Sequence, residues 1–332
     1  MFSSHKHGGQ LRLASQHYGI PLEAWLDLST GISPWAYPLP AVPSACWQRL
    51  PESGDGLELA AAHYYGSAYL LSVSGSQESI RRLPQLRPPA QRVGILSPAY
   101  HSHRQAWLAA GHEVVELTAA QLETCLPTLD VLVVVNPTNP TAQHYPAATL
   151  WHWHQTLSAR GGWLVVDEAF MDATPADSLI SQHPLPGLVV LRSIGKFFGL
   201  AGIRLGFVWA EACVLQALAQ LQDDWSVSNP ARWAGRQALA DTGWQQQQRE
   251  RLRTASQRFQ RLLTAYDSGQ QVTSSALFAY WRLEKAEALH QRLAQQGILT
   301  RLFTQPPALR LGLPATETEW QRLEQGVASC QR

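Results

Sequence analysis

The sequence predicts an α/β protein with a mostly parallel central sheet flanked by helices and, beyond it, a small α+β domain. Short apolar or β-branched runs indicate the sheet's strands at 93–96, 131–135, 163–166 and 188–191. Helix-compatible stretches separate the last three runs, and a spacing of about 30 residues matches the size of a βαβ unit. The runs lack polar alternation, which is typical of strands covered by helices on both faces.

Two further runs, at 114–117 and 205–210, are expected to extend this sheet, the second after a tight connection at 199–202. A short apolar run, LLSV, precedes the VSGSQESI segment. The stretch 82–92, RLPQLRPPAQR, is predicted to be a loop because its prolines cannot continue a helix.

The remaining third of the chain shows a different pattern. The segment 244–266 is rich in Gln, Arg and Leu at helical spacing and predicts a long helix joining two lobes. After it come signals for a strand at 276–283, a helix at 285–296 and a strand at 309–312, as expected of a small α+β domain. We predict four segments: an N-terminal segment 1–44 that packs with the small domain and the substrate site, a large cofactor-binding domain 45–215, connecting helices 216–266, and a small C-terminal domain 267–332.

Composition excludes several classes of partner. Lys and Arg total 26 against 25 acidic residues in 332, so the near-neutral charge does not favour nucleic acid or an anionic membrane surface. The four cysteines are scattered, without a CxxC pair, which fits a reducing cytoplasm. The start of the chain has no apolar signal region, and we expect a cytoplasmic protein with neither export nor a membrane anchor. We predict no metal site, because His152 and His154 would point to different faces of a helix.

Polar side chains follow three of the predicted strands. Asn136 opens NPTNPT after VLVVV, Asp167 opens DEAF after WLVV, and Ser193 follows LVVL in RSIGKFFGLAGIRLGF. In open α/β sheets ligands bind outside the carboxyl ends of the strands. We therefore expect an amide, a carboxylate and the lysine Lys196 to meet in one crevice.

These groups match the needs of pyridoxal 5'-phosphate (PLP). Asp167 can keep the pyridine nitrogen protonated, Asn136 can donate to the ring's O3', and Lys196 can form a Schiff base with the cofactor. Ser193 and Arg204 can hold the phosphate. The plainer alternatives are a helix N-cap for Asp167, an ordinary turn for NPTNPT and a solvated surface residue for Lys196.

A further phosphate cradle is available in VSGSQESI. Gly75, Ser76 and Gln77 would begin a helix directly after a strand, where free backbone N–H groups favour an anion.

The pattern SxxKxxGxxGxRxG resembles that of fold type I PLP enzymes of the aminotransferase class I and II group, with NPTNPT and DEAF in the expected order ahead of it. The pattern's residues here are Ser193, Lys196, Gly199, Gly202, Arg204 and Gly206. The resemblance covers nearly the whole chain and implies PLP as cofactor, with Lys196 and Asp167 catalytic. It also implies that Arg310, in RLGLP, binds the substrate carboxylate.

The amino terminus, HGGQLRLASQHYGIPLEAWLDLSTGISPW, resembles that of threonine-phosphate decarboxylases of cobalamin biosynthesis. Phe170 fits this group, since histidinol-phosphate aminotransferases usually carry Tyr there. The resemblance implies PLP-dependent conversion of L-threonine O-3-phosphate to (R)-1-amino-2-propanol O-2-phosphate and carbon dioxide. It also implies substrate contacts from an anion site at a helix start and from the loop after it: His7, Gly8, Gly9 and Ser29, with Arg310.

Two other functions stay open at this point. One is an aminotransferase acting on a phosphorylated substrate such as histidinol phosphate, and the other is a non-catalytic binding partner in the corrinoid pathway. The resemblance implies a homodimer, and contact with the next enzyme of the pathway is a further possibility.

Two positions depart from the pattern of relatives. An aromatic ring often stacks on the pyridine, and in PAYHSH a rough alignment gives His103, with Tyr100 as the nearby alternative. Dimeric relatives often reach a tyrosine of an RYPD-like motif into the neighbour's phosphate site, where RLPE here has Leu50. Either another residue replaces that tyrosine or the phosphate has one ligand fewer.

Overall fold

The computed structural model describes residues 8–266 and 272–329. We call its two compact units the sheet unit and the terminal unit. The sheet unit comprises Tyr37–Asn139 and His144–Gln247, and the terminal unit Met1–Ala36, Pro140–Gln143 and Gln248–Arg332. This division is coarser than the four segments predicted from the sequence, which stay a prediction.

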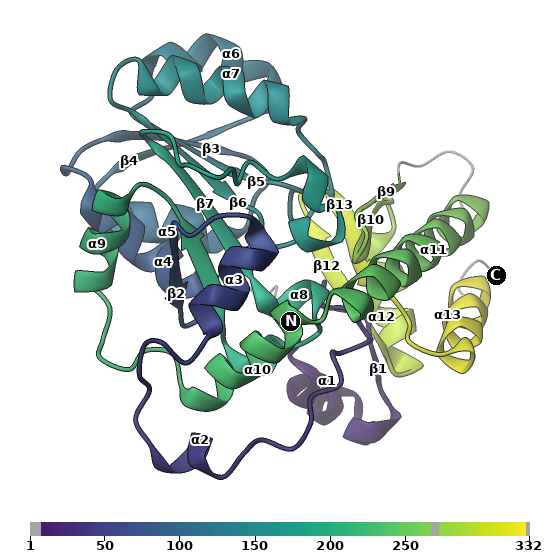
Figure 1. Ribbon diagram of the computed structural model, residues 1–332. Helices are drawn as coiled ribbons and strands as arrows, with labels where there is room; N and C mark the ends of the chain where they lie inside the picture. The colour runs from purple at the N-terminus through teal and green to yellow at the C-terminus, as the bar shows by residue number, and fades with distance from the viewer. Residues whose placement is uncertain (1–7, 267–271, 330–332) are drawn as a thin grey trace. The chain divides into compact units, whose positions relative to one another are not determined.

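The sheet unit is built on one seven-stranded sheet. Its strands are β2 (Leu70–Val73), β3 (Arg92–Leu96), β4 (Glu113–Leu117), β5 (Val131–Val135), β6 (Trp163–Asp167), β7 (Leu188–Ser193) and β8 (Gly206–Trp209). Their order is β2-β8-β7-β6-β5-β3-β4 (Figure 1). Only β8 runs antiparallel to its neighbours, β2 and β7, and the other neighbouring pairs are parallel. The predicted mostly parallel sheet is confirmed.

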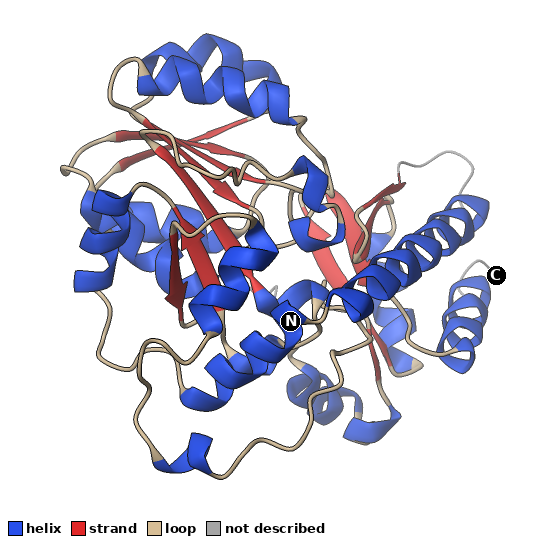
Figure 2. Cartoon of the chain, in the orientation of Figure 1, coloured by secondary structure: helices blue, strands red, loops and turns tan. Residues whose placement is uncertain are grey.

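Helices cover both faces of this sheet (Figure 2). The helices of the sheet unit are α2 (Ala45–Gln48), α3 (Leu57–Tyr65), α4 (Ser76–Arg82), α5 (His101–Ala109), α6 (Ala119–Cys125), α7 (Ala147–Ser158), α8 (Ile194–Phe197), α9 (Ala212–Gln220) and α10 (Asn229–Ala240), of which α2 packs against α10 and not on the sheet. Side chains alternate between the two faces along each strand. Val166 and Val190 lie in the core beneath α6 and α7, whereas Val165 and Leu191 lie in the core beneath α4, α5 and α9. Both faces are apolar, which explains the uninterrupted runs in the sequence.

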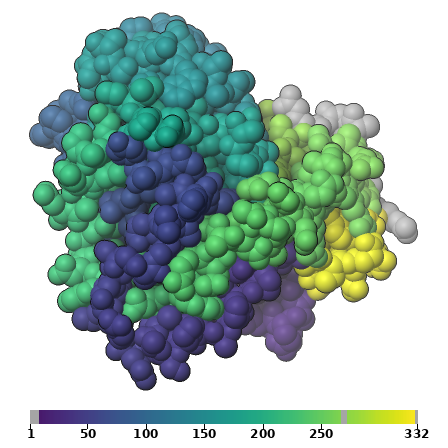
Figure 3. All heavy atoms as spheres, viewed as in Figure 1, coloured from purple at the N-terminus to yellow at the C-terminus, as the bar shows by residue number. Residues whose placement is uncertain are grey.

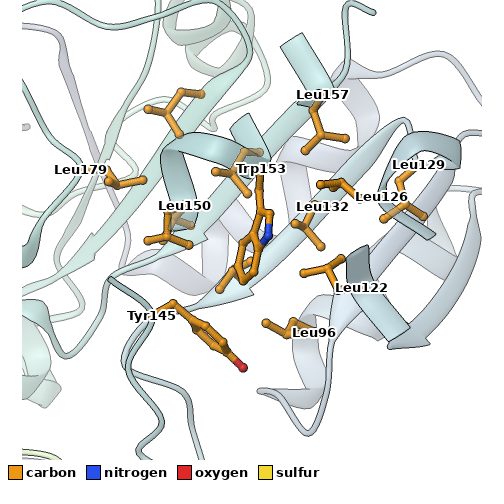
Figure 4. Packing of buried hydrophobic residues seen from close by; sticks show 14 of the residues in the cluster. Leu96, Leu122, Leu126, Leu129, Leu132, Tyr145, Leu150, Trp153, Leu157 and Leu179 are labelled. Atoms are coloured by element: carbon orange, nitrogen blue, oxygen red, sulfur yellow. The ribbon is translucent and has the colours of Figure 1, made fainter. Parts of the chain in front are cut away.

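The core beneath α6 and α7 centres on Trp153. Figure 4 shows its indole surrounded by leucines from the strands and helices, with Tyr145 at one side. The indole N–H donates to Oε1 of Glu123 (2.9 Å), so the buried ring keeps a hydrogen-bond partner. α6 itself begins with a capping box, in which Thr118 and Gln121 exchange hydrogen bonds.

The loop predicted at 82–92 is wrong in its first part. A short 3-10 helix runs over Leu83–Leu86, and β3 already begins at Arg92. Pro84 stands in the first turn of that helix, where no backbone N–H is needed.

The terminal unit is an α+β assembly. Its elements are α1 (Leu11–Tyr18), β1 (Leu26–Asp27), β9 (Val272–Ser274), β10 (Phe278–Arg282), α12 (Ala286–Gln295), β11 (Ile298–Leu299), β12 (Arg301–Thr304), β13 (Pro307–Gly312) and α13 (Glu317–Ser329). An antiparallel sheet has the order β12-β13-β10-β9, and β1 pairs with β11 in parallel. The long helix α11 (Thr242–Tyr266) gives its residues up to Gln247 to the sheet unit and the rest to the terminal unit.

The strands and helices predicted for this part of the chain are present, but β1, β9, β11, β12 and α13 were not predicted. Over residues 8–266 and 272–329, no helix combines the length and the apolar character needed to cross a bilayer.

Candidate functional site

Three side chains predicted from the sequence end neighbouring strands. Val135 of β5 pairs in register with Asp167 of β6, and Asp167 pairs with Leu191 of β7. The hydrogen-bond ladder between β5 and β6 continues past the end of β5, because the backbone N–H of Asn136 donates to the backbone carbonyl of Asp167 (2.9 Å). Asn136, Asp167 and Ser193 therefore lie at the carboxyl ends of β5, β6 and β7. These strands are neighbours in the sheet (Figure 1), and ligands bind outside the carboxyl ends of the strands in open α/β folds.

The Asp167 carboxylate is buried and held from two sides. The Ala169 amide donates to Oδ1 (3.1 Å), and Nε2 of His103 lies 2.9 Å from Oδ2. His103 comes from α5 and is 1% exposed, so water does not compete for this contact. When Asp167 is ionised, the contact requires the proton on Nε2. A carboxylate fixed in this way is suited to a protonated ring nitrogen.

The Asn136 amide is fixed by the backbone of Tyr145. Its Nδ2 donates to the Tyr145 carbonyl (3.0 Å), and its Oδ1 accepts from the Tyr145 amide (2.9 Å). Asn136 is fully buried. The amide nitrogen carries two protons, so one is left for a further acceptor at this edge.

Gly75, Ser76 and Arg204 form a cradle at the start of α4. Gly75 has φ +71° and ψ 155°, a conformation essentially restricted to glycine. A Cβ there would lie 2.7 Å from Nη2 of Arg204, so the guanidinium packs directly on the Gly75 backbone. Gly206 of β8 serves a similar purpose, because a Cβ there would lie 2.8 Å from the Ser76 nitrogen. The two glycines allow backbone N–H groups and a cation to approach one anion.

Lys196 and Tyr100 lie in the same unit. Nζ of Lys196, on α8, is 5.7 Å from the centre of the Phe170 ring. The Tyr100 hydroxyl donates to Oε1 of Gln77, the residue that follows Ser76 in α4. The ring contact predicted for Tyr100 or His103 stays a prediction.

The terminal unit contains the other predicted residues, apart from His7, which lies outside the described residues. The Gly9 amide donates to Oγ of Ser29 (2.8 Å), and that hydroxyl donates to Oδ1 of Asp27 (2.6 Å). Gly8 approaches the same loop so closely that a Cβ would clash with the Ser29 carbonyl oxygen. Nη2 of Arg310 donates to that carbonyl (2.9 Å). Gly8, Gly9, Ser29 and Arg310 therefore lie together.

The Arg310 guanidinium is buried. Burial lowers its pKa to about 9, the neighbouring Arg301 contributes to the lowering, and Asp27 opposes the shift. Arg301 of β12 pairs in register with Arg310 of β13. Two cations held so close together disfavour each other's charge, and an anion between them would relieve that cost.

Arg301 was missed by the sequence reasoning. The signal is the QPP turn at 305–307, which folds the flanking runs into a hairpin and brings 301 opposite 310. Among the described residues, no group of three or more His, Cys, Asp and Glu side chains could hold a metal ion.

The chain belongs to the aminotransferase class I and II family, whose model matches residues 52–325. It is 53% identical over 319 residues to the threonine-phosphate decarboxylase of Pseudomonas aeruginosa, with 96% of each chain covered. It is 38% identical over 331 residues to the threonine-phosphate decarboxylase of a Sinorhizobium species, with 97% of each chain covered. Its fold is similar to that of histidinol-phosphate aminotransferase from Sinorhizobium meliloti in complex with PLP, with a TM-score of 0.83, 22% identity, and 96% of this chain and 93% of that chain covered.

Proposed function

We propose that this protein is a PLP-dependent decarboxylase. It converts L-threonine O-3-phosphate to (R)-1-amino-2-propanol O-2-phosphate and carbon dioxide, a step of cobalamin biosynthesis. The observation that carries the substrate and the reaction is the 53% identity, over 96% of the chain, to the Pseudomonas aeruginosa enzyme. The sheet unit's side chains support the cofactor independently.

PLP needs a cradle for its phosphate, a carboxylate for its ring nitrogen and an amine for its aldehyde. The backbone N–H groups at the start of α4, together with Ser193 and Arg204, suit the phosphate. The cradle requires glycine at 75 and 206, because a Cβ at either position would clash with Arg204 or with the Ser76 backbone. Asp167 suits the ring nitrogen, and Lys196 is the amine for covalent attachment. When bound, PLP supplies an electron sink for the electron pair left on the substrate Cα. The chain's own residues set how that sink is held.

Asp167 and Asn136 act on the ring in this proposal, and Gln77 acts through Tyr100. Asp167 keeps the ring nitrogen protonated, Asn136 donates its second amide proton to O3', and Gln77 holds the Tyr100 hydroxyl. We assign the ring face to Tyr100. His103 is assigned to Asp167, because its hydrogen bond holds the carboxylate in a fixed orientation.

The terminal unit's arginines suit a substrate with two anionic groups. L-threonine O-3-phosphate carries a carboxylate and a phosphate, and Arg310 and Arg301 offer two guanidinium groups. Ser29, Gly8 and Gly9 form the wall beside Arg310. The substrate contact of His7, which lies outside the described residues, stays a prediction. Decarboxylation requires the bond from Cα to the carboxylate to stand perpendicular to the ring. Binding both the carboxylate and the phosphate of the substrate fixes the direction of that bond better than binding one of them.

A homodimer in the cytoplasm completes the proposal. Trp47, Leu50 and Leu59 of the sheet unit are 67%, 60% and 64% exposed, so large apolar side chains are available for a second copy of the chain to cover. Figure 3 shows their segment as dark blue atoms at the surface, beside the green atoms of α10. Sedimentation of the PLP-loaded protein tests this, and a monomer at micromolar concentration would contradict it.

The decisive experiment incubates the PLP-loaded protein with L-threonine O-3-phosphate and no keto acid. Steady release of carbon dioxide and aminopropanol phosphate over many turnovers is the expected result, with Lys196→Ala as the inactive control. Turnover of histidinol phosphate only after 2-oxoglutarate is added would make the protein an aminotransferase instead. Failure of added PLP to produce a visible absorbance band would favour the non-catalytic partner.

A further inference from the structure

A buried ionic cluster lies directly behind the predicted cofactor residues, and none of its members has a role in the proposed chemistry. It consists of Arg192, Glu168 and Asp172, which we call the Arg192 cluster. Nη1 of Arg192 donates to Oε2 of Glu168 (2.7 Å), and Nη2 donates to Oδ1 of Asp172. All three side chains are at most 2% exposed.

The cluster is extensively hydrogen-bonded. Glu168 also accepts from the Ser178 hydroxyl (2.6 Å) and the Leu179 amide (2.8 Å). The Tyr64 hydroxyl of α3 donates to Asp172 (3.1 Å). Burial alone would lower the pKa of Arg192, but the charges of Asp172 and Glu168 raise it, so the guanidinium stays charged.

Two cluster members directly follow or precede predicted cofactor residues. Glu168 follows Asp167, and Arg192 precedes Ser193. Because side chains alternate along a strand, Glu168 and Arg192 point to the face of Val166 and Val190. Asp167 and Ser193 point to the opposite face, that of Val165 and Leu191.

The geometry points to Arg192 as a positioning residue for the cofactor site, an inference that rests on the proposed function. By clasping Glu168 and Asp172, Arg192 joins the end of β6 to the end of β7 and fixes the backbone from which Asp167 and Ser193 project. The planar guanidinium directs Nη1 and Nη2 at two carboxylates in one fixed geometry, whereas an ammonium is a compact point charge whose donors rotate freely.

The link extends toward the residue proposed for covalent attachment. The Tyr64 ring, whose hydroxyl binds Asp172, packs 5.7 Å from the Phe198 ring. Phe198 directly follows α8, which carries Lys196. One cluster thus supports the strand ends that hold the carboxylate and the serine, and the helix that holds the lysine.

Stability alone does not explain such a cluster. Replacing a buried ion network by neutral groups of similar volume is often neutral or stabilising, whereas breaking it by removing one partner is costly. The test therefore uses two variants: Arg192→Lys, which keeps the charge but not the bridge, and the triple variant Arg192→Met, Glu168→Gln, Asp172→Asn, which removes every charge. Arg232→Lys is the matched control, because Arg232 also binds two acids, Asp55 and Glu58, with a side chain only 7% exposed.

The measurements are the PLP dissociation constant, the visible circular dichroism of bound PLP, and denaturant unfolding of the PLP-free protein. We expect both Arg192 variants to bind PLP roughly tenfold or more weakly, the usual scale for residues that orient ligand-binding groups, with altered circular dichroism. Arg232→Lys should lower stability and leave both PLP readouts unchanged.

Folded Arg192 variants with wild-type PLP affinity and circular dichroism would overturn the positioning role. So would failure of both variants to fold, which would make the cluster purely structural. Wild-type protein that binds no PLP would instead refute the proposed function, so the two failures are distinguishable.

Discussion

Gly75→Ala is the sharpest perturbation of the cradle at the start of α4. The new Cβ would lie 2.7 Å from Nη2 of Arg204, and relief to an ordinary contact of 3.4 Å moves the guanidinium by about 0.7 Å. A shift of that size stretches a hydrogen bond of about 2.9 Å beyond about 3.5 Å, where it is effectively lost. The backbone of the cradle would then keep its shape, but the Arg204 guanidinium would no longer be within hydrogen-bond distance of the phosphate.

The magnitude follows from the lost bond. A hydrogen bond to a charged group contributes about 1.5–3 kcal/mol, so PLP should bind about 10- to 150-fold more weakly. The backbone conformation at Gly75 adds a separate cost of about 1–3 kcal/mol, which falls on the stability of the PLP-free protein. Affinity comes from titration of PLP-free protein while following its visible absorbance, and stability comes from denaturant unfolding.

Gly66→Ala separates the two effects. Gly66 also has a positive φ, +74°, but no atom lies within 4 Å of the position that an alanine methyl group would take, so alanine meets backbone strain without a clash. It should cost about 1–2 kcal/mol of stability and leave PLP affinity unchanged. Wild-type affinity in Gly75→Ala, or equal weakening in both variants, would refute the reasoning.

Three further predictions concern charge and hydrogen bonding. Arg310 must be protonated to bind an anion, and burial lowers its pKa to about 9. Substrate affinity should therefore be constant below that pH and fall about tenfold per pH unit above it. A KM that stays constant up to about pH 10.5, roughly 1.5 pH units above that pKa, would contradict this. Arg301→Gln removes the neighbouring positive charge, so the alkaline fall should move to higher pH while KM at pH 7 rises; an unmoved alkaline limb would mean that the two arginines do not interact. His103→Leu removes the hydrogen bond to Asp167 and should lower kcat about 10- to 150-fold with PLP still bound, whereas wild-type kcat would show that Asp167 needs no support from His103.

The sheet could be predicted because its strands are apolar on both faces. Residues 131–135, VLVVV, fit only a buried strand or a buried helix segment, and the flanking spacing decides between them. The antiparallel direction of β8 could not be predicted, since the four residues of Gly206–Trp209 fit either direction equally well. Short strands such as β1 and β11, with two residues each, carry no periodic signal at all.

The site was predictable where a polar functional side chain comes directly at the end of a strand, as at Asn136 and Asp167. The contact between His103 and Asp167 was not, because it joins residues 64 apart and depends on the direction in which α5 presents its side chains. Arg310 was expected from its motif, but its partner Arg301 is visible only through the hairpin register.

The pair Asp167 and Glu168 shows why the register between β6 and β7 matters for function. The two carboxylates are adjacent, and alternation sends one toward the proposed cofactor and the other to Arg192. A slip by one residue would exchange the faces, burying Asp167 where no contact is built for it and turning Glu168 away from its guanidinium. Breaking a buried ion pair costs about 3–5 kcal/mol, so Arg192 makes the slipped register unfavourable. The charge of Arg192, which takes no part in the proposed chemical step itself, thus favours the register in which Asp167 faces the proposed cofactor site.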